Sequence, residues 1–198
     1  KMEASVFKSV TMSDLSSGRM PAALEGGELL NCSGAPISMS RIKMMVQKAE
    51  NELAYLELEK ANNHLNSAAR GLGCLKDSLD NDVAQRLFFL RGISASIEEN
   101  NGATTKAFEM ALTFKPDLNW DKYFAPTSKP IFDEVKKAAA LAKEVDLTIY
   151  PSSVVGVTWV DGVALSTGEK PKLSPGEHVI QIDWGRMISF RILIDENA

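Results

Sequence analysis

The sequence predicts an α+β protein in which helical hairpins come first and a small antiparallel β-domain follows. Three observations predict this fold class. Apolar residues recur at helical spacing from residue 40 to residue 141, a proline and two serines interrupt the pattern at 151–153, and the apolar period becomes two from Val154. We therefore divide the chain into an irregular N-terminal arm at 1–36, a helical domain with a capping helix at 37–146, and a β-domain at 150–198.

The composition is that of a folded globular protein. Of 198 residues, 44% are hydrophobic and 24% are charged, and the formal net charge is -4. Binding to phosphate backbones or to an anionic membrane needs a surplus of Lys and Arg on one face, so the acidic balance argues against a general affinity for either. No stretch has the length and apolarity of a membrane-spanning helix. We expect no nucleic-acid partner and no transmembrane segment.

The first helical hairpin is predicted from Ser40 onward, with Ser38 or Ser40 as the N-cap. The apolar positions of its first helix are Ile42, Met45, Val46, Ala49, Leu53 and Leu56. A second helix is predicted from about Glu57, and the glycines at 71 and 73 mark its end.

A second hairpin follows the polar turn "KDSLDND". Its first helix has apolar residues at Val83, Leu87, Phe88, Leu90, Ile93 and Ile97 and is predicted to stop at "NNG". Its second helix is predicted to begin at Thr104 or Thr105 and to be halted by Pro116. The two hairpins repeat with a spacing of about 41 residues.

A last helix is predicted after an aromatic-rich connection. Thr127 or Ser128 caps this helix, and Pro130 lies in its first turn. We expect it to cover the open face of the second hairpin. Loops that carry several aromatic residues usually bury them, so three side chains should pack between this helix and the hairpins: Trp120, Tyr123 and Phe124.

The β-domain is predicted from two turn signals. Asp161-Gly162 is a hairpin signal between β-branched and aromatic runs, and Ser174-Pro175-Gly176 precedes the strand "EHVIQIDW". With the final strand "MISFRILI", we expect three or four strands.

The stretch "LFFLRGISASIEENNGATTKAFEMALTFKP" resembles a tetratricopeptide repeat. With Gln85 as the first position, the repeat's bulky, small, aromatic and proline positions fall on Phe88, Gly92, Ala95, Thr104, Phe108, Ala111 and Pro116. Arg91 and Glu99 depart from the pattern. A weaker copy in "LEKANNHLNSAARGL" matches through Ala61, Leu65 and Ala68.

The same resemblance implies a protein-binding groove, because the first helix of each tetratricopeptide pair lines the concave face of the array. The groove residues implied here are Lys43, Val46, Glu50, Leu53, Arg86, Phe89, Ile93 and Ser96. Phe89 and Ile93 would be its apolar anchors. A partner peptide, the N-terminal arm or the β-domain could each cover them.

The tail from Tyr150 resembles a PEGA domain, a small β-module of bacterial envelope proteins. The match is carried by Val160, Asp161, Gly162, Leu173, Pro175, Gly176, His178 and Val179, whereas "YPSS" departs from the family's opening Pro-Glu-Gly-Ala. The resemblance implies binding or assembly in the envelope, not chemistry.

The two cysteines, Cys32 and Cys74, leave two interpretations open. They are either free, buried thiols or a disulfide that ties the N-terminal arm to the first hairpin. The disulfide would indicate an oxidising compartment such as the periplasm.

No pattern in the sequence indicates catalysis. The only histidines are His64 and His178, and neither has an acidic or cysteine partner at metal-ligand spacing. No phosphate-binding loop, nucleophile elbow or dinucleotide fingerprint is present. We expect no metal and no cofactor, and a protein that is not an enzyme.

These features predict a non-catalytic adaptor or scaffold that binds another protein in the bacterial cell envelope. We expect the periplasm, with a signal peptide already removed. One alternative is a glycan or peptidoglycan-binding module that uses Trp159 or Trp184 as a stacking platform, and another is a cytoplasmic regulatory subunit.

Overall fold

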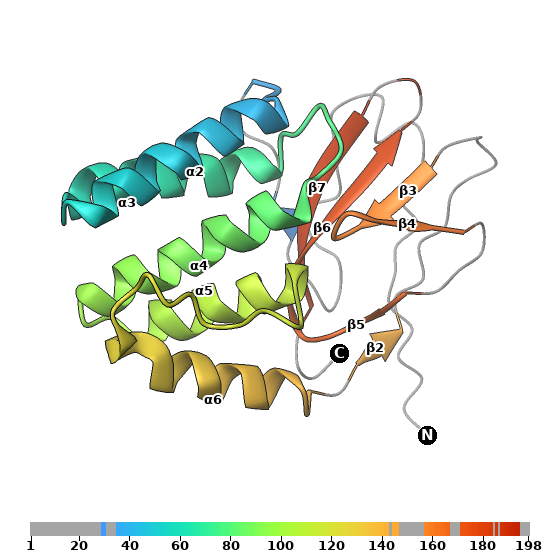
Figure 1. Ribbon diagram of the computed structural model, residues 1–198. Helices are drawn as coiled ribbons and strands as arrows, with labels where there is room; N and C mark the ends of the chain where they lie inside the picture. The colour runs from blue at the N-terminus through green and yellow to red at the C-terminus, as the bar shows by residue number, and fades with distance from the viewer. Residues whose placement is uncertain are drawn as a thin grey trace.

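The protein combines helical hairpins with an antiparallel sheet in one α+β body (Figure 1). The computed structural model describes residues 29–30, 35–142, 144–146, 157–166, 171–183, 185 and 187–194. The helices lie on one side of the molecule and the sheet on the other (Figure 1). Helices that precede a small antiparallel sheet confirm the predicted fold class.

Two helical hairpins and a further helix form the α-part. The elements are α2 (Met39–Ala54), α3 (Leu58–Leu72), α4 (Asn81–Ile97), α5 (Asn101–Phe114), the 3-10 turn η1 (Pro126–Ser128) and α6 (Lys129–Ala139). Ser38, one of the two residues predicted as the N-cap, caps α2. The start predicted for α5 at Thr104 or Thr105 was wrong. The Asn100 side chain accepts the Ala103 N–H at 3.1 Å, and this cap begins the helix three residues earlier.

Both hairpins turn through the same Schellman motif. After α2, the Glu57 N–H bonds to the Glu52 carbonyl and the Leu56 N–H bonds to the Leu53 carbonyl. The equivalent bonds after α4 run from Asn100 to Ala95 and from Glu99 to Ser96. Leu56 and Glu99 therefore occupy equivalent left-handed positions, with φ of 58° and 57°. They stand about 43 positions apart, close to the predicted repeat spacing.

The helices of the second hairpin approach closely at Gly92. A Cβ atom on Gly92 would lie 2.5 Å from Cδ1 of Phe108 and closer still to Cε1, so only glycine fits there. Phe88, Phe108 and Ala111 are all buried, as the repeat offsets predicted. In the first hairpin, Ala61, Leu65 and Ala68 are buried too, and they correspond to Thr104, Phe108 and Ala111 of the second.

The main sheet has the strand order β1-β7-β6-β3-β4, and all its pairings are antiparallel. Its strands are β1 (Leu29–Leu30), β3 (Val157–Val160), β4 (Val163–Leu165), β6 (Gly176–Asp183) and β7 (Met187–Ile194). A separate pair consists of β2 (Val145–Asp146) and β5 (Lys172–Leu173). The four C-terminal strands of the main sheet agree with the prediction, whereas β1 comes from the N-terminal arm.

Alternate residues of β6 face two different cores. Ile180 belongs to a small cluster on the sheet itself, together with Val160, Leu173, Ile192 and Ile194. Val179, one residue earlier, belongs to the large core of the helices. Because side chains alternate along a strand, the sheet covers the helices with one face and closes its own core with the other.

A buried polar clamp joins the sheet to the α3–α4 connection. The Gln181 side chain accepts the Leu79 N–H at 2.7 Å and donates to the Asp77 carbonyl at 3.0 Å and to Ser189 Oγ at 2.8 Å. Ser189 in turn donates to the Leu75 carbonyl at 2.9 Å. Fully satisfied buried polar groups of this kind fix the position of one element against another.

Candidate functional site

The side chains of the predicted groove do not form an open groove. Phe89 and Ile93, the expected apolar anchors, have exposed fractions of 1% and 4%, and Val46 and Leu53 are buried as well. Glu50, Arg86 and Ser96 are half-buried. Only Lys43 is exposed, so the apolar part of this surface cannot receive a partner.

The chain fills this space with its own aromatic side chains. The ring centroid of Phe89 lies 5.4 Å from that of Trp120, 5.7 Å from Phe124 and 5.9 Å from Phe132. Trp120 and Phe124 belong to the connection between α5 and α6, and this connection covers Phe89. The predicted packing of this connection is confirmed for Trp120 and Phe124 and wrong for Tyr123, which is 85% exposed.

Ionic contacts hold the cover in place. Arg86 of α4 donates to Glu50 of α2 and, at 2.7 Å, to Asp121 of the connection. Burial lowers the pKa of Arg86, but the bonds to the two carboxylates outweigh it and keep the pKa above its usual value. Ser96, the last predicted groove residue, shares a 2.7 Å hydrogen bond with Ser128 of η1.

Asp161 and His178 form a buried pair in the β-domain. Asp161 lies in the β3–β4 turn with φ of 49°, and Gly162 follows with φ of 75°, as a type I′ turn requires. Asp161 Oδ1 accepts the Val179 N–H at 2.8 Å, and Oδ2 lies 2.6 Å from His178 Nδ1. His178 Nε2 lies 2.7 Å from the Ser174 carbonyl oxygen.

The surroundings of His178 leave no ring nitrogen for chemistry. The Asp161 carboxylate and the Ser174 carbonyl both accept, so each nitrogen donates and the ring carries two protons. Burial lowers the pKa of His178, but Asp161 outweighs it and raises the pKa above 6.5. The ring is 2% exposed. The pair therefore fastens two turns of the sheet and cannot act as a general base or a metal ligand.

The sequence identified Asp161 and His178 only as members of a motif, not as contacting residues. Their Asp-Gly and Pro-Gly-x-His turns lie 17 residues apart. Two features of the sequence could have indicated that Asp161 and His178 touch. His178 lies next to a turn, and Asp161 lies in a turn that needs a positive φ.

His64 has an acidic neighbour that the sequence spacing did not reveal. Its Nε2 lies 3.4 Å from Glu52 Oε1, across the α2–α3 hairpin. Within the described ranges, no group of three His, Cys, Asp or Glu residues is placed to hold a metal ion. Among the helices described, none has the length and apolarity to cross a membrane.

Cys74 is disulfide-bonded. Cys32, the only other cysteine in the sequence, lies outside the described residues. Beside Cys74 the chain is held by backbone contacts, because the Ile37 N–H donates to the Cys74 carbonyl at 2.9 Å and Ile37 forms a parallel bridge with Leu75.

The tryptophans of the alternative glycan site are placed differently. Trp159 is half-buried in β3, where it pairs across the strands with Ala164 and Gln181. Trp184 lies outside the described residues.

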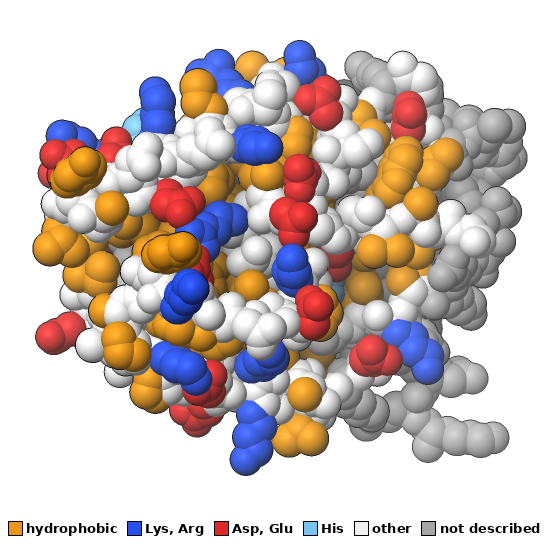
Figure 2. Space-filling model, viewed as in Figure 1, with side chains coloured by type: hydrophobic (Ala, Val, Ile, Leu, Met, Phe, Trp, Pro, Cys, Tyr) orange, Lys and Arg blue, Asp and Glu red, His pale blue; other side chains and the backbone are white. Residues whose placement is uncertain are grey.

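Large apolar side chains are exposed at the end of the helices that lies away from the sheet. Tyr55 and Leu56 of the α2–α3 turn are 81% and 71% exposed, and Ile97 at the end of α4 is 43% exposed. Both turns lie at the left end of the molecule in Figure 1, and hydrophobic side chains gather there in Figure 2. We call Tyr55, Leu56 and Ile97 the apolar end.

Comparisons with protein-family models, with curated proteins and with solved structures find no significant match for this chain.

Proposed function

We propose that the protein is a non-catalytic adaptor that binds another protein in the bacterial cell envelope. The tetratricopeptide-like offsets and the PEGA-like tail support a binding role. The disulfide bond at Cys74 fits an oxidising compartment such as the periplasm. The enclosed Asp161–His178 pair supports the non-catalytic part of the proposal, since it offers no free acid or base.

The apolar end, rather than the filled groove, is the proposed contact surface. The observation that carries this proposal is Leu56, a leucine that is both exposed and held in the left-handed backbone region. A residue with a side chain in that region costs about 1 kcal/mol compared with glycine, and an exposed leucine gains no compensating packing within the chain. Binding by that side chain explains why this exposed turn carries a leucine where the equivalent turn carries Glu99.

The rest of the molecule gives this surface a rigid support. The polar clamp of Gln181 and Ser189 fixes the sheet to the opposite end of the helices. The Arg86 contacts fix the connection between α5 and α6. A partner that contacts the apolar end therefore meets a preformed surface, which lowers the entropy cost of binding.

The chain itself supplies a matched control for the test. Leu56→Gly removes the proposed contact and the backbone strain together, whereas Glu99→Gly removes the same strain at the equivalent turn and no apolar side chain. Both variants should be as stable as the parent protein or more stable. Leu56→Gly should lose capture of the partner from an envelope extract, and Glu99→Gly should keep it. Equal capture by the two variants would remove the apolar end from the proposal.

A further inference from the structure

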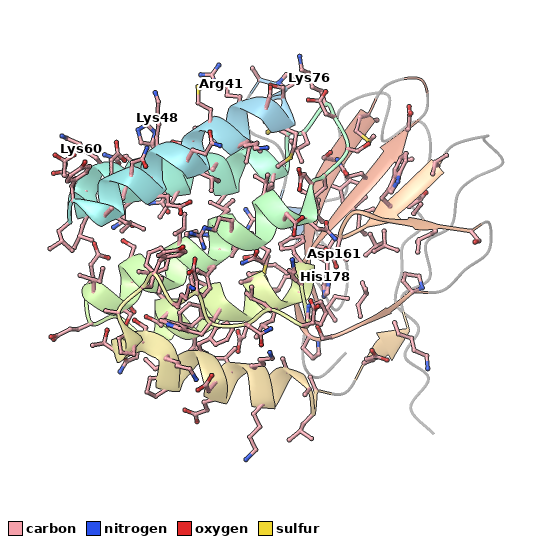
Figure 3. All side chains as sticks on the ribbon, in the orientation of Figure 1. Arg41, Lys48, Lys60, Lys76, Asp161 and His178 are labelled. Atoms are coloured by element: carbon pink, nitrogen blue, oxygen red, sulfur yellow. The ribbon has the colours of Figure 1, made fainter. Side chains whose placement is uncertain are left out.

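The outer face of α2 carries positive charge and no carboxylate. Its exposed residues are Ser40, Arg41, Lys43, Met44, Gln47, Lys48, Asn51 and Ala54. We call Arg41, Met44 and Lys48, which recur at steps of three and four residues, the α2 basic face. In Figure 3, Arg41 and Lys48 project to the same side of the hairpin, together with Lys60 and Lys76.

Both glutamates of α2 make contacts with other helices. Glu50 pairs with Arg86, and Glu52 lies beside His64, and both are half-buried. The acids of the helix thus serve internal contacts, while its cations stay in solvent. Within the part of the chain that the structure describes, Arg41, Lys43 and Lys48 form no ion pair.

This segregation changes what the net charge implies. A total of -4 argues against anion binding only when the charges are mixed over the surface. Here a helix of 16 residues, about 24 Å long, exposes Arg41 and Lys48 on one stripe, while its glutamates pair with Arg86 and His64. The acidic net charge of the whole chain therefore does not exclude an anionic partner at this face.

Met44 favours a lipid surface over other anions. It is 47% exposed and lies on the same stripe as Arg41 and Lys48, three positions after one and four before the other. A nucleic acid or an acidic peptide gains little from an exposed thioether among cations. The interface of an anionic bilayer accommodates the cations and Met44 together. Headgroup phosphates contact the cations, while the apolar side chain reaches the boundary of the acyl chains.

We propose that the α2 basic face binds the surface of an anionic lipid bilayer. Arg41 and Lys48 contact headgroup phosphates, and Met44 inserts at the edge of the acyl region. This goes beyond the proposed adaptor role, because it uses a different surface from Leu56 and Ile97. Together the two surfaces would present a partner protein beside a membrane.

Sedimentation with vesicles tests the proposal on the full chain. Vesicles containing phosphatidylglycerol should bind the protein, vesicles of phosphatidylcholine alone should not, and binding should fall as salt is added. Arg41→Gln with Lys48→Gln should weaken binding about thirtyfold. The control is Lys106→Gln with Lys137→Gln, which removes the same charge from exposed positions of α5 and α6 and should leave binding unchanged. Circular dichroism melts check that all variants fold.

Three results would overturn the lipid-binding proposal. The first is equal loss of binding in both double variants, which would indicate only a net-charge effect. The second is binding to polyglutamate without binding to anionic vesicles. The third is unchanged vesicle binding by Met44→Gln, for which we expect about fivefold weaker binding. None of these outcomes bears on the partner-capture experiment with Leu56→Gly, so the two proposals fail independently.

Discussion

Replacement of Gly92 by alanine should destabilise the protein, although alanine is the better helix former. The new Cβ atom would lie 2.5 Å from Cδ1 and 2.9 Å from Cζ of Phe108, well inside contact distance. Overpacking of this kind costs about 1 to 3 kcal/mol. The gain in helix propensity from glycine to alanine is only about 1 kcal/mol.

The surroundings of Phe108 place Gly92→Ala near the upper end of that range. The Phe108 ring lies 5.4 Å from Phe132 and 5.7 Å from Phe89, centroid to centroid. It cannot move away from position 92 without displacing the aromatic cluster that fills the predicted groove. We therefore expect a net loss of about 2 kcal/mol in the free energy of unfolding.

Urea denaturation with two companion variants checks this value. Gly102→Ala is the control, because the nearest atom to its Cβ is Asn100 Oδ1 at 3.9 Å; it should gain up to about 1 kcal/mol. Phe108→Leu should cost less in the Gly92→Ala background than in the parent, because the smaller side chain removes the clash. A Gly92→Ala protein as stable as Gly102→Ala would refute the close approach of α4 and α5.

Three further predictions concern the β-domain and the cysteines. The pKa of His178 is raised on folding, so its contribution to stability should be fully present below pH 6.5 and should be lost as the pH rises through the folded-state pKa. Thermal melts recorded at a series of pH values measure this loss. Asp161→Asn should remove most of the dependence of the melting temperature on pH. Gln181→Ala leaves the Leu79 N–H buried without its partner and should cost about 2 to 3 kcal/mol in a urea titration; a loss below 0.5 kcal/mol would contradict the clamp. Denatured, unreduced protein isolated from the envelope should show no free thiol with a thiol reagent, and two thiols per chain would weaken the envelope assignment.

The local pattern of the sequence predicted most helices and strands, because each of those elements is long enough to show a period. Examples are the helices α2 and α4 and the strand β6, each of which has eight or more residues. Strands β1 and β2 have two residues each and therefore carry no period. The start of α5 was missed because the asparagines that indicate the end of one helix also cap the next.

The sequence could not show whether the candidate groove is open, because the residues that fill it come from a distant segment of the chain. The repeat offsets predicted that Phe89 lines a groove, but Trp120 and Phe124 lie about thirty positions further along the chain and cover it. The α2 basic face was missed for a related reason. Glu50 and Glu52 lie close to Lys48 in the sequence, and only the structure shows that they contact Arg86 and His64.

Site-specific photo-crosslinking tests whether a partner contacts the apolar end and not the predicted groove. A photoreactive residue would replace Leu56 or Ile97 at the apolar end, Lys43 as the exposed residue of the predicted groove, or Leu141, which is 78% exposed after α6. We expect the same crosslinked protein from positions 56 and 97 and none from positions 43 and 141. A crosslink from position 43 with none from 56 or 97 would contradict this expectation.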